Sequence, residues 1–340
     1  GIDFSHYKAA TVTRRIERRL ALNRSIDLEM YANQLRKDPR ELNSLYEDLL
    51  IGVTRFFRDD AAFGVLETKV IPEIIARTAG DEQIRVWVAG CATGQEPYSI
   101  AMLLHEQLSA ARRPINVKIL ATDVHKTSLE VASAGVYGEV QVSGIAPERL
   151  QRFFTLKADG YHVSQALRET IVFAPHNLIR DAPFTKLDLV VCRNLLIYFQ
   201  PHAQQTVLTL FHFCLKPGGF LFLGSSESPG TLLEEFDTVD EHNKVYRKRR
   251  DIALPRDLKL PLARSAPLPR AAAPALSRST TIHPQLLAAY DRLLDRFMPP
   301  SFLVDADGTL VDSFGGVAPL LKIKQRRPSA HLVDMLDDDL

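Results

Sequence analysis

The segment Val86–Ile100 constrains the fold of this chain more than any other part of the sequence. It reads V-W-V-A-G-C-A-T-G-Q-E-P-Y-S-I, which is a short apolar run, a turn with Gly90 and Gly94, and a helical pattern with Glu96 in its first turn. A strand, a glycine turn and a helix in this order form the unit with which α/β proteins hold nucleotide-like cofactors. The G-x-x-x-G spacing differs from the dinucleotide pattern G-x-G-x-x-G. The segment therefore predicts a ligand loop without identifying the ligand.

Short apolar runs alternate with helical patterns around this turn. The runs predict strands at Ile84–Ala89, Val117–Thr122, Leu187–Cys192 and Phe220–Leu223, and the clearest helices are Pro97–Leu108 and His202–Leu215. Strands that alternate with helices form a mostly parallel sheet covered on both faces. We therefore predict an α/β fold with a doubly wound sheet.

Residues 1–80 contain no convincing strand and predict a small helical module. Asp27 is placed to cap one helix, and Pro39 suits the first turn of the next. Asp59 or Asp60 is placed to cap a further helix. We expect an all-α domain over this range.

Three further segments depart from the alternating pattern. Residues 137–175 indicate a small antiparallel insertion, and the Pro-, Ala- and Arg-rich residues 251–282 indicate a linker. In the remaining tail, Ser301–Val311 indicates a strand-turn-strand that resembles the opening hairpin of a PAS sensor domain. The predicted domains are residues 1–80, 81–250, 251–282 and 283–340, the last being a partial PAS-like segment.

The composition gives little reason to expect nucleic-acid binding, a metal site or membrane insertion. Lys and Arg number 42 against 41 Asp and Glu, so the total charge shows no preference for nucleic acid. The three cysteines provide no disulfide framework and form no C-x-x-C pair, which fits a reducing compartment. No apolar run approaches the ~20 residues that a membrane span needs. We expect a cytoplasmic protein without a metal, cut from a longer polypeptide.

Four loops follow the carboxyl ends of predicted strands, where open α/β sheets bind ligands. They contain Gly90–Glu96, Asp123, Pro175–Leu178, and the group Arg193, Asn194 and Tyr198. A carboxylate at Asp123 suits the two hydroxyls of a ribose, and the alternative is a cap for a helix at Lys126–Ala134. Upstream, Val53–Arg58 contains two aromatics and two arginines, and its spacing alone favours packing aromatics with solvated arginines.

Six motifs follow one another along this sequence. They are T-x-F-F-R, A-G-C-A-T-G-x-E-P-Y-S-I-A, A-T-D, P-x-N-L, C-R-N-x-x-I-Y-F and L-K-P-G-G-x-L-x-L-G-x-S-E. In this order and spacing they resemble the CheR family of chemotaxis-receptor methyltransferases. The resemblance covers residues 2 to about 249. It implies a Rossmann-like methyltransferase sheet that binds S-adenosylmethionine. It also implies methylation of glutamate side chains on receptor helices, which gives γ-carboxyl methyl esters.

The resemblance also implies the site residues, position by position. With Gly90 of the glycine turn, the cofactor contacts fall on Thr54, Arg58, Glu96, Asp123, Asn177, Leu178, Arg193 and Asn194. Tyr198 matches a tyrosine near the reactive sulfonium, and we assign it to shaping the methyl channel. Arg58 holds either the substrate glutamate or the cofactor carboxylate. One position departs from the family, which often has Asn where this chain has Gly52.

The first twenty residues predict a helix, in which the apolar residues at roughly helical spacing are Phe4, Tyr7, Val12, Ile16 and Leu20. Arg14, Arg15, Arg18 and Arg19 share one side of that helix. A solvated basic face is the usual explanation of such a run. The resemblance favours docking to the acidic cytoplasmic helices of chemoreceptors, since a basic helix would steer them. Fused or associated signalling domains are further possible partners.

Two other functions compete with the methyltransferase reading. A cofactor-binding regulatory module without turnover is the first, and Gly52 is the sequence feature that favours it. A methyltransferase for small molecules or nucleic acid is the second. Enzymes that methylate amino groups of bases carry an N/D-P-P-Y-type motif at the fourth strand, whereas this chain has C-R-N at Cys192–Asn194.

Overall fold

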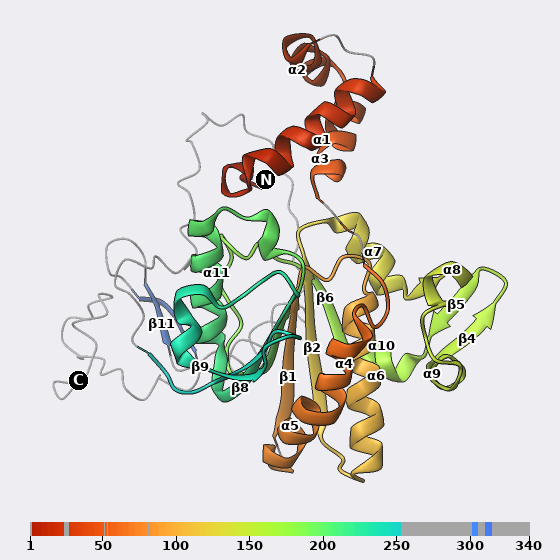
Figure 1. Ribbon diagram of the computed structural model, residues 1–340, viewed down its shortest axis with the longest axis vertical. Helices are drawn as coiled ribbons and strands as arrows, with labels where there is room; N and C mark the ends of the chain where they lie inside the picture. Colours follow the sequence, from red (N-terminus) through yellow and green to blue (C-terminus); the bar gives the residue numbers. More distant parts are fainter. Residues whose placement is uncertain are drawn as a thin grey trace, which may run out of the picture. The chain divides into compact units, whose positions relative to one another are not determined.

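A computed structural model describes residues 2–23, 27–50, 52, 54–80, 82–252, 301–304 and 310–314. The chain divides into two compact units, Gly1–Ala266 and Pro267–Leu340. Within the first unit, a helical module is followed by a sheet domain with a small antiparallel subdomain (Figure 1).

The helical module contains η1 (Phe4–His6), α1 (Ala9–Leu22), α2 (Leu28–Lys37) and α3 (Pro39–Leu49). Its helix starts follow the predictions. The Asp27 carboxylate accepts a hydrogen bond from the backbone nitrogen of Met30 at 2.7 Å, and Pro39 occupies the first turn of α3. Such caps satisfy backbone donors that have no partner within the helix.

A buried carboxylate joins the three helices of the module. Glu41 of α3 accepts hydrogen bonds from the Tyr31 hydroxyl at 2.7 Å, from Asn23 Nδ2 at 2.8 Å and from Arg19 Nε at 2.9 Å. These partners come from α2, from the end of α1 and from α1 itself. These charged and polar side chains are therefore part of the internal structure of the module.

The main sheet has the strand order β6-β2-β1-β7-β8-β10-β9. Its strands are β1 (Gln83–Ala89), β2 (Asn116–Asp123), β6 (Ile171–Pro175), β7 (Leu187–Cys192), β8 (Leu215–Leu223), β9 (Phe236–Asp240) and β10 (Val245–Lys248). The pairs from β6 to β8 are parallel. The edge formed by β10 and β9 is antiparallel. The predicted mostly parallel, doubly wound sheet is thus confirmed.

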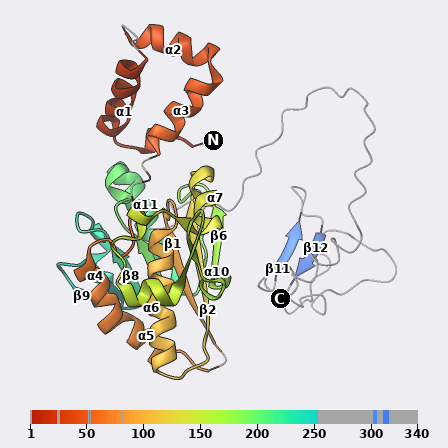
Figure 2. The same ribbon diagram turned by 90° about the vertical axis from the view of Figure 1, so that its right-hand side faces the viewer.

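Helices cover both faces of the sheet (Figures 1 and 2). They are α4 (Asp60–Val65), the π-helical turn η2 (Leu66–Val70), α5 (Ile71–Arg77), α6 (Gln95–Ala110), α7 (Lys126–Ala134), α10 (Gln165–Thr170) and α11 (Pro201–Cys214), with a 3-10 turn at η4 (Gly230–Glu235). Successive side chains of β1 point to opposite faces of the sheet and therefore pack in two different hydrophobic clusters. Val86 and Val88 pack in the cluster that contains Ile100 of α6. Trp87 packs in the cluster that contains Phe211 of α11, with ring centroids 5.4 Å apart.

The expected domain boundary at residue 80 needs correction. Phe56, Phe63 and Ile74 are buried in the same cluster as the strand residue Val86. Residues from Thr54 onward therefore belong to the sheet domain, because their apolar side chains complete its core. Helical periodicity alone does not reveal this, since it does not show which partner a helix packs against.

The predicted insertion is a three-stranded antiparallel sheet of order β3-β5-β4. It comprises β3 (Val136–Tyr137), α8 (Glu139–Val142), α9 (Pro147–Phe153), β4 (Phe154–Lys157) and β5 (Gly160–Val163). The expected end at residue 175 is too late. Ile171–Pro175 forms β6, which pairs in parallel with β2 in the main sheet.

In the second unit, β11 (Ser301–Val304) and β12 (Leu310–Phe314) pair in antiparallel fashion, as the strand-turn-strand pattern predicts. The predicted linker beyond residue 252 and the rest of the PAS-like segment lie outside the described residues. Within the described parts of the chain, none of the helices has the length and apolar character to cross a membrane.

Candidate cofactor site

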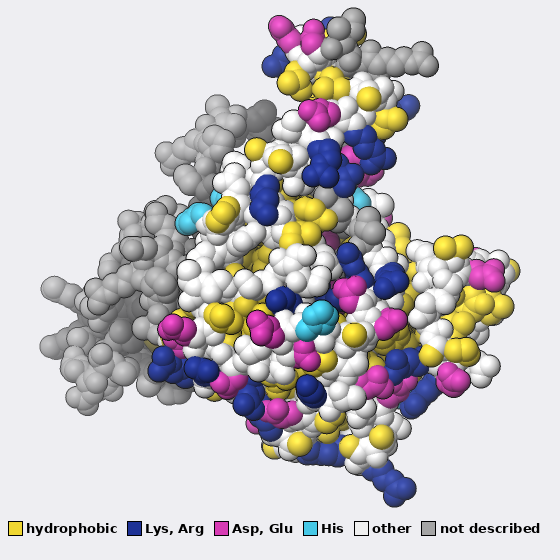
Figure 3. All heavy atoms as spheres, in the orientation of Figure 1, with side chains coloured by type: hydrophobic (Ala, Val, Ile, Leu, Met, Phe, Trp, Pro, Cys, Tyr) yellow, Lys and Arg dark blue, Asp and Glu magenta, His cyan; other side chains and the backbone are white. Residues whose placement is uncertain are grey.

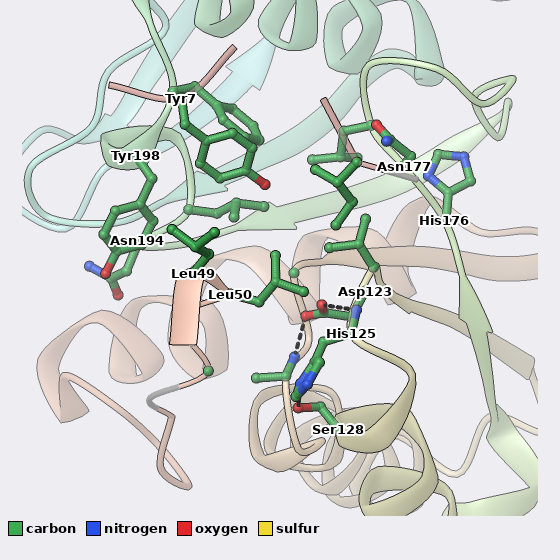
Figure 4. Close-up of a pocket in the computed structure, with 18 of the residues that line it drawn as sticks. Tyr7, Leu49, Leu50, Asp123, His125, Ser128, His176, Asn177, Asn194 and Tyr198 are labelled. Atoms are coloured by element: carbon green, nitrogen blue, oxygen red, sulfur yellow. Dashed lines mark hydrogen bonds between the residues drawn. The ribbon is translucent and has the colours of Figure 1, made fainter. Parts of the chain in front are cut away.

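A cavity of about 350 Å³ lies at the carboxyl ends of β1, β2, β6 and β7 and continues to the helical module (Figure 4). Every residue that the sequence predicted for cofactor binding or catalysis lines it. These residues are Thr54, Arg58, Gly90, Glu96, Asp123, Asn177, Leu178, Arg193, Asn194 and Tyr198. They come from five separate segments. Four of these follow the parallel strands β1, β2, β6 and β7, whose carboxyl ends lie at one edge of the sheet.

The glycine turn closes against the loop that follows β7. Gly90 has φ +75°, and its backbone nitrogen donates to the Thr122 carbonyl at 2.8 Å. A Cβ on Gly90 would lie 2.8 Å from Leu195 Cδ2. Glycine is favoured here by the left-handed backbone, and a Cβ would also displace the Leu195 side chain.

The Asp123 carboxylate ties together the two loops that follow β1 and β2. One oxygen accepts from the Ala92 nitrogen at 2.8 Å and the other from the His125 nitrogen at 2.9 Å. In the described structure, α7 begins after His125 without a side-chain cap. The capping alternative for Asp123 is therefore wrong. The carboxylate lines the cavity in a fixed orientation instead.

Arg193 binds two carboxylates at the inner wall of the cavity. Its Nη1 lies 2.9 Å from Glu96 Oε1 and 3.0 Å from the Arg58 carbonyl, and its Nη2 lies 2.7 Å from Asp59 Oδ2. The guanidinium lies over the Phe222 ring, 4.5 Å from its centroid. Burial raises the pKa of Glu96, and the charge of Arg193 opposes that shift. This pairing explains why Asp59 precedes α4 without acting as its side-chain cap.

A second buried carboxylate shapes the loop after β7, which includes the short helix η3 (Leu196–Tyr198). Glu227 accepts from the backbone nitrogens of Gly224 at 2.7 Å, Asn194 at 3.0 Å and Ile197 at 3.3 Å. Asn194 has φ +58°, a left-handed conformation that Asn tolerates better than most residues. Glu227 lies in the G-x-S-E motif, and the sequence by itself does not indicate its role.

The first residues of the chain also line the cavity, which the sequence did not indicate. Ile2, Asp3, His6 and Tyr7 contribute to its wall. Tyr7 forms an isolated antiparallel bridge with Phe199, far away in the sequence. The only sequence signal was the apolar spacing of Tyr7 with the first helix, and that spacing gives no reason to place it in a ligand site.

The four arginines of α1 have different surroundings. Arg14 and Arg18 are exposed, and Arg18 lies 3.9 Å from Asp48. Arg15 lines the cavity. Arg19 is mostly buried, because its guanidinium bonds Glu41 within the module. Arg19 is therefore not available for the predicted docking face.

Several buried polar atoms of the cavity wall make no hydrogen bond within the described residues. They are His125 Nε2, His176 Nδ1, Arg193 Nε and Asn194 Oδ1. Buried polar atoms in native proteins usually have a partner. The cavity therefore suits a ligand with several polar groups. Over the same described residues, no group of three or more His, Cys, Asp and Glu side chains could hold a metal ion.

Comparisons with known proteins agree with this geometry. Residues 52–245 match the family described as CheR methyltransferase, SAM binding domain, and residues 1–50 match CheR methyltransferase, all-alpha domain. The boundary between the two matches agrees with the packing of residues from Thr54 onward on the sheet.

Three relatives show how far the similarity extends. The chain is 37% identical over 340 residues to the uncharacterized 104.1 kDa protein in hypE 3'region of Rhodobacter capsulatus, and it spans 35% of that relative's length. It is 40% identical over 191 residues to chemotaxis protein methyltransferase 1 of Pseudomonas aeruginosa, covering 55% of this chain and 69% of that protein. It is 32% identical over 254 residues to chemotaxis protein methyltransferase 2 of Vibrio cholerae, covering 73% of this chain and 86% of that protein. The chain therefore belongs to the CheR methyltransferase family, and it contains the S-adenosylmethionine-binding domain of that family.

Proposed function

We propose that this protein methylates glutamate side chains on the cytoplasmic helices of chemoreceptors, using S-adenosylmethionine and producing γ-carboxyl methyl esters. The observation that carries this proposal is the convergence of Arg58, Tyr198 and the predicted cofactor residues on one cavity. Two relatives named as chemotaxis protein methyltransferases support methyl transfer in chemotaxis. We expect the protein to act in the cytoplasm, where the receptor helices lie.

The residues of the cavity fit the cofactor. The Asp123 carboxylate, held by two backbone donors, is suited to accept hydrogen bonds from the ribose hydroxyls. The unpartnered atoms of His125 and Asn194 provide additional polar contacts. When bound, S-adenosylmethionine supplies an electrophilic methyl group. Asn177, Leu178 and the glycine turn complete the wall around it.

The chemistry requires alignment more than proton transfer. A glutamate side chain is already ionised at neutral pH, so it needs no general base. Holding two reactants in line is worth ~7 kcal/mol or more of the activation barrier. We assign this role to the cavity wall, with Tyr198 shaping the approach to the methyl group. The planar guanidinium of Arg58 suits a carboxylate, either that of the substrate glutamate or that of the cofactor.

The basic side chains of the helical module are suited to dock the receptor. Figure 3 shows Lys and Arg side chains gathered over α1. Arg14 and Arg18 are exposed there. Because receptor methylation helices are acidic, these charges would accelerate association and orient the substrate.

Transfer of radiolabelled methyl groups to receptor helices tests the proposal. We expect label on glutamate residues, released as methanol by mild base because the product is an ester. Arg58→Ala should reduce the transfer at least tenfold, and Arg112→Ala, at the opposite end of the sheet, is the control. Binding of S-adenosylmethionine by the wild-type protein without any transfer would instead support the regulatory module. Gly52, which lines the cavity where the family often has Asn, is the feature that favours the regulatory module.

A further inference from the structure

The start of the chain is attached to the loop that carries Tyr198. The Lys8 nitrogen donates to the Tyr198 carbonyl at 2.8 Å, and the Gln200 nitrogen donates to the His6 carbonyl at 2.8 Å. Between them, Tyr7 and Phe199 face each other as an antiparallel bridge. We name residues 3–8 the strap. Its backbone holds the same loop that contributes Asn194 and Tyr198 to the cavity.

Side chains reinforce the attachment of the strap. Gln200 Nε2 donates to the Ser5 carbonyl at 2.8 Å and to the Tyr7 carbonyl at 3.2 Å. The Tyr7 ring packs edge-on against Phe199, with centroids 5.0 Å apart, and contacts Phe4 at 5.3 Å. Rings held on two sides have little rotational freedom. This packing therefore limits the positions that the Tyr7 hydroxyl can take.

The Tyr7 hydroxyl points into the cavity, toward the region between Asp123 and the loop after β7 (Figure 4). It forms no hydrogen bond with any residue that the structure describes. Burial, together with the nearby charge of Asp123, raises the pKa of Tyr7 to about 12. The phenol therefore remains protonated at neutral pH and is available as a donor.

We propose that Tyr7 is a cofactor-binding residue, and that the strap closes the cavity over bound S-adenosylmethionine. The proposal rests on the proposed function. It adds that the Tyr7 hydroxyl binds S-adenosylmethionine at the wall of the cavity that Asp123 also lines. The strap precedes α1 directly. Cofactor binding would thus order the helical module relative to the Tyr198 loop, and the module would present its basic face with the site closed.

Calorimetric titration with S-adenosylhomocysteine tests the role of Tyr7 without depending on turnover. We expect Tyr7→Phe to weaken binding about five- to tenfold, as for one lost hydrogen bond, and Tyr7→Ala to weaken it further. Tyr46→Phe is the matched control, because Tyr46 also packs on Phe4 but does not line the cavity. It should bind within about twofold of the wild type. Wild-type affinity in both Tyr7 variants would overturn the assignment.

The strap itself is tested by hydrogen exchange. Saturating S-adenosylhomocysteine should slow exchange at the Lys8 and Gln200 amides, and Gln200→Ala should weaken binding about threefold or more, whereas Gln165→Ala on α10 should not. Unchanged exchange at both amides would overturn the closure. Neither binding nor exchange depends on methyl transfer.

The two proposals can therefore fail separately. Absence of methyl transfer by the wild-type protein would reject the proposed function, whereas the role of Tyr7 is decided by the binding of S-adenosylhomocysteine.

Discussion

The guanidinium of Arg193 holds the carboxylate of Glu96 inside the protein, with 2.9 Å between Nη1 and Oε1. The Arg193 side chain is 2% exposed and that of Glu96 10%. Arg193 follows β7 and Glu96 lies in the first turn of α6, so the pair connects the two loops that form the inner wall of the cavity. A buried charge that loses its partner is costly, because neither water nor another group compensates it.

Glu96→Ala should therefore destabilise the protein by about 3 kcal/mol. Asp59 would still neutralise Arg193, which keeps the loss below that of a wholly unpaired charge. Urea unfolding of the two proteins measures the difference. Glu130→Ala, at an exposed position of α7, serves as the control and should lie within about 0.5 kcal/mol of the wild type. Equal stability of the Glu96 and Glu130 variants would contradict the prediction.

The Glu41 cluster predicts an acid-sensitive helical module. The hydrogen bond from Arg19, followed by that from Tyr31, holds the pKa of Glu41 below its usual value of 4.5. A carboxyl with a lowered pKa in the folded state stabilises that state above its unfolded pKa, and this stabilisation is lost as the pH falls through the lowered value.

We expect the free energy of unfolding of the wild type to fall more steeply than that of Glu41→Gln as the pH drops below the usual glutamate pKa of 4.5. Glu47→Gln, on the exposed side of α3, is the matched control and should follow the wild type. Parallel curves for the wild type and the Glu41 variant would show that the cluster does not contribute to acid sensitivity.

The two glycines of the cavity wall should respond differently to alanine. At Gly90, with φ +75°, a Cβ would lie 2.8 Å from Leu195. Gly90→Ala should cost about 1–3 kcal/mol in strain and weaken binding of S-adenosylhomocysteine. At Gly52 the nearest atoms would be 3.7 Å and 3.9 Å away, which is ordinary contact, so Gly52→Ala should be tolerated. Thermal unfolding and calorimetry of both variants test this contrast, and equal behaviour would refute it.

Asp123→Ala should weaken cofactor binding at least about tenfold, since it removes both the proposed acceptor for the ribose and the link between two loops. Calorimetry with S-adenosylhomocysteine measures the change. Asp159→Ala, in the turn of the antiparallel subdomain, controls for the loss of a carboxylate elsewhere. An unchanged affinity for the Asp123 variant would count against the ribose role.

The double variant Arg14→Glu and Arg18→Glu should lower kcat/KM for receptor helices about three- to tenfold at low salt, while leaving cofactor affinity unchanged. The difference should shrink at high salt, because exposed charges are screened. Arg112→Glu reverses a charge at the far end of the sheet and provides the control. Equal methylation rates for the double variant and the wild type at low salt would remove α1 from the docking surface.

The sequence alone determined the local structure of the first unit. Apolar periodicity placed the parallel strands and their helices, Asp27 and Pro39 marked helix starts, and the spacing of Gly90 and Gly94 indicated the ligand loop. These features follow from interactions between residues close in the sequence, so they are readable without the fold. The ordered motifs then identified the family and placed the proposed cofactor residues on the chain.

The tertiary structure decided which of these residues act together. It paired Asp59 with Arg193 rather than with its own helix, placed Phe56 in the core of the sheet, and brought Tyr7 to the cavity beside Phe199. Each contact joins segments more than thirty residues apart in the sequence. Local propensity carries no information about such pairs, because their free energy depends on which surfaces are buried against each other once the sheet has formed.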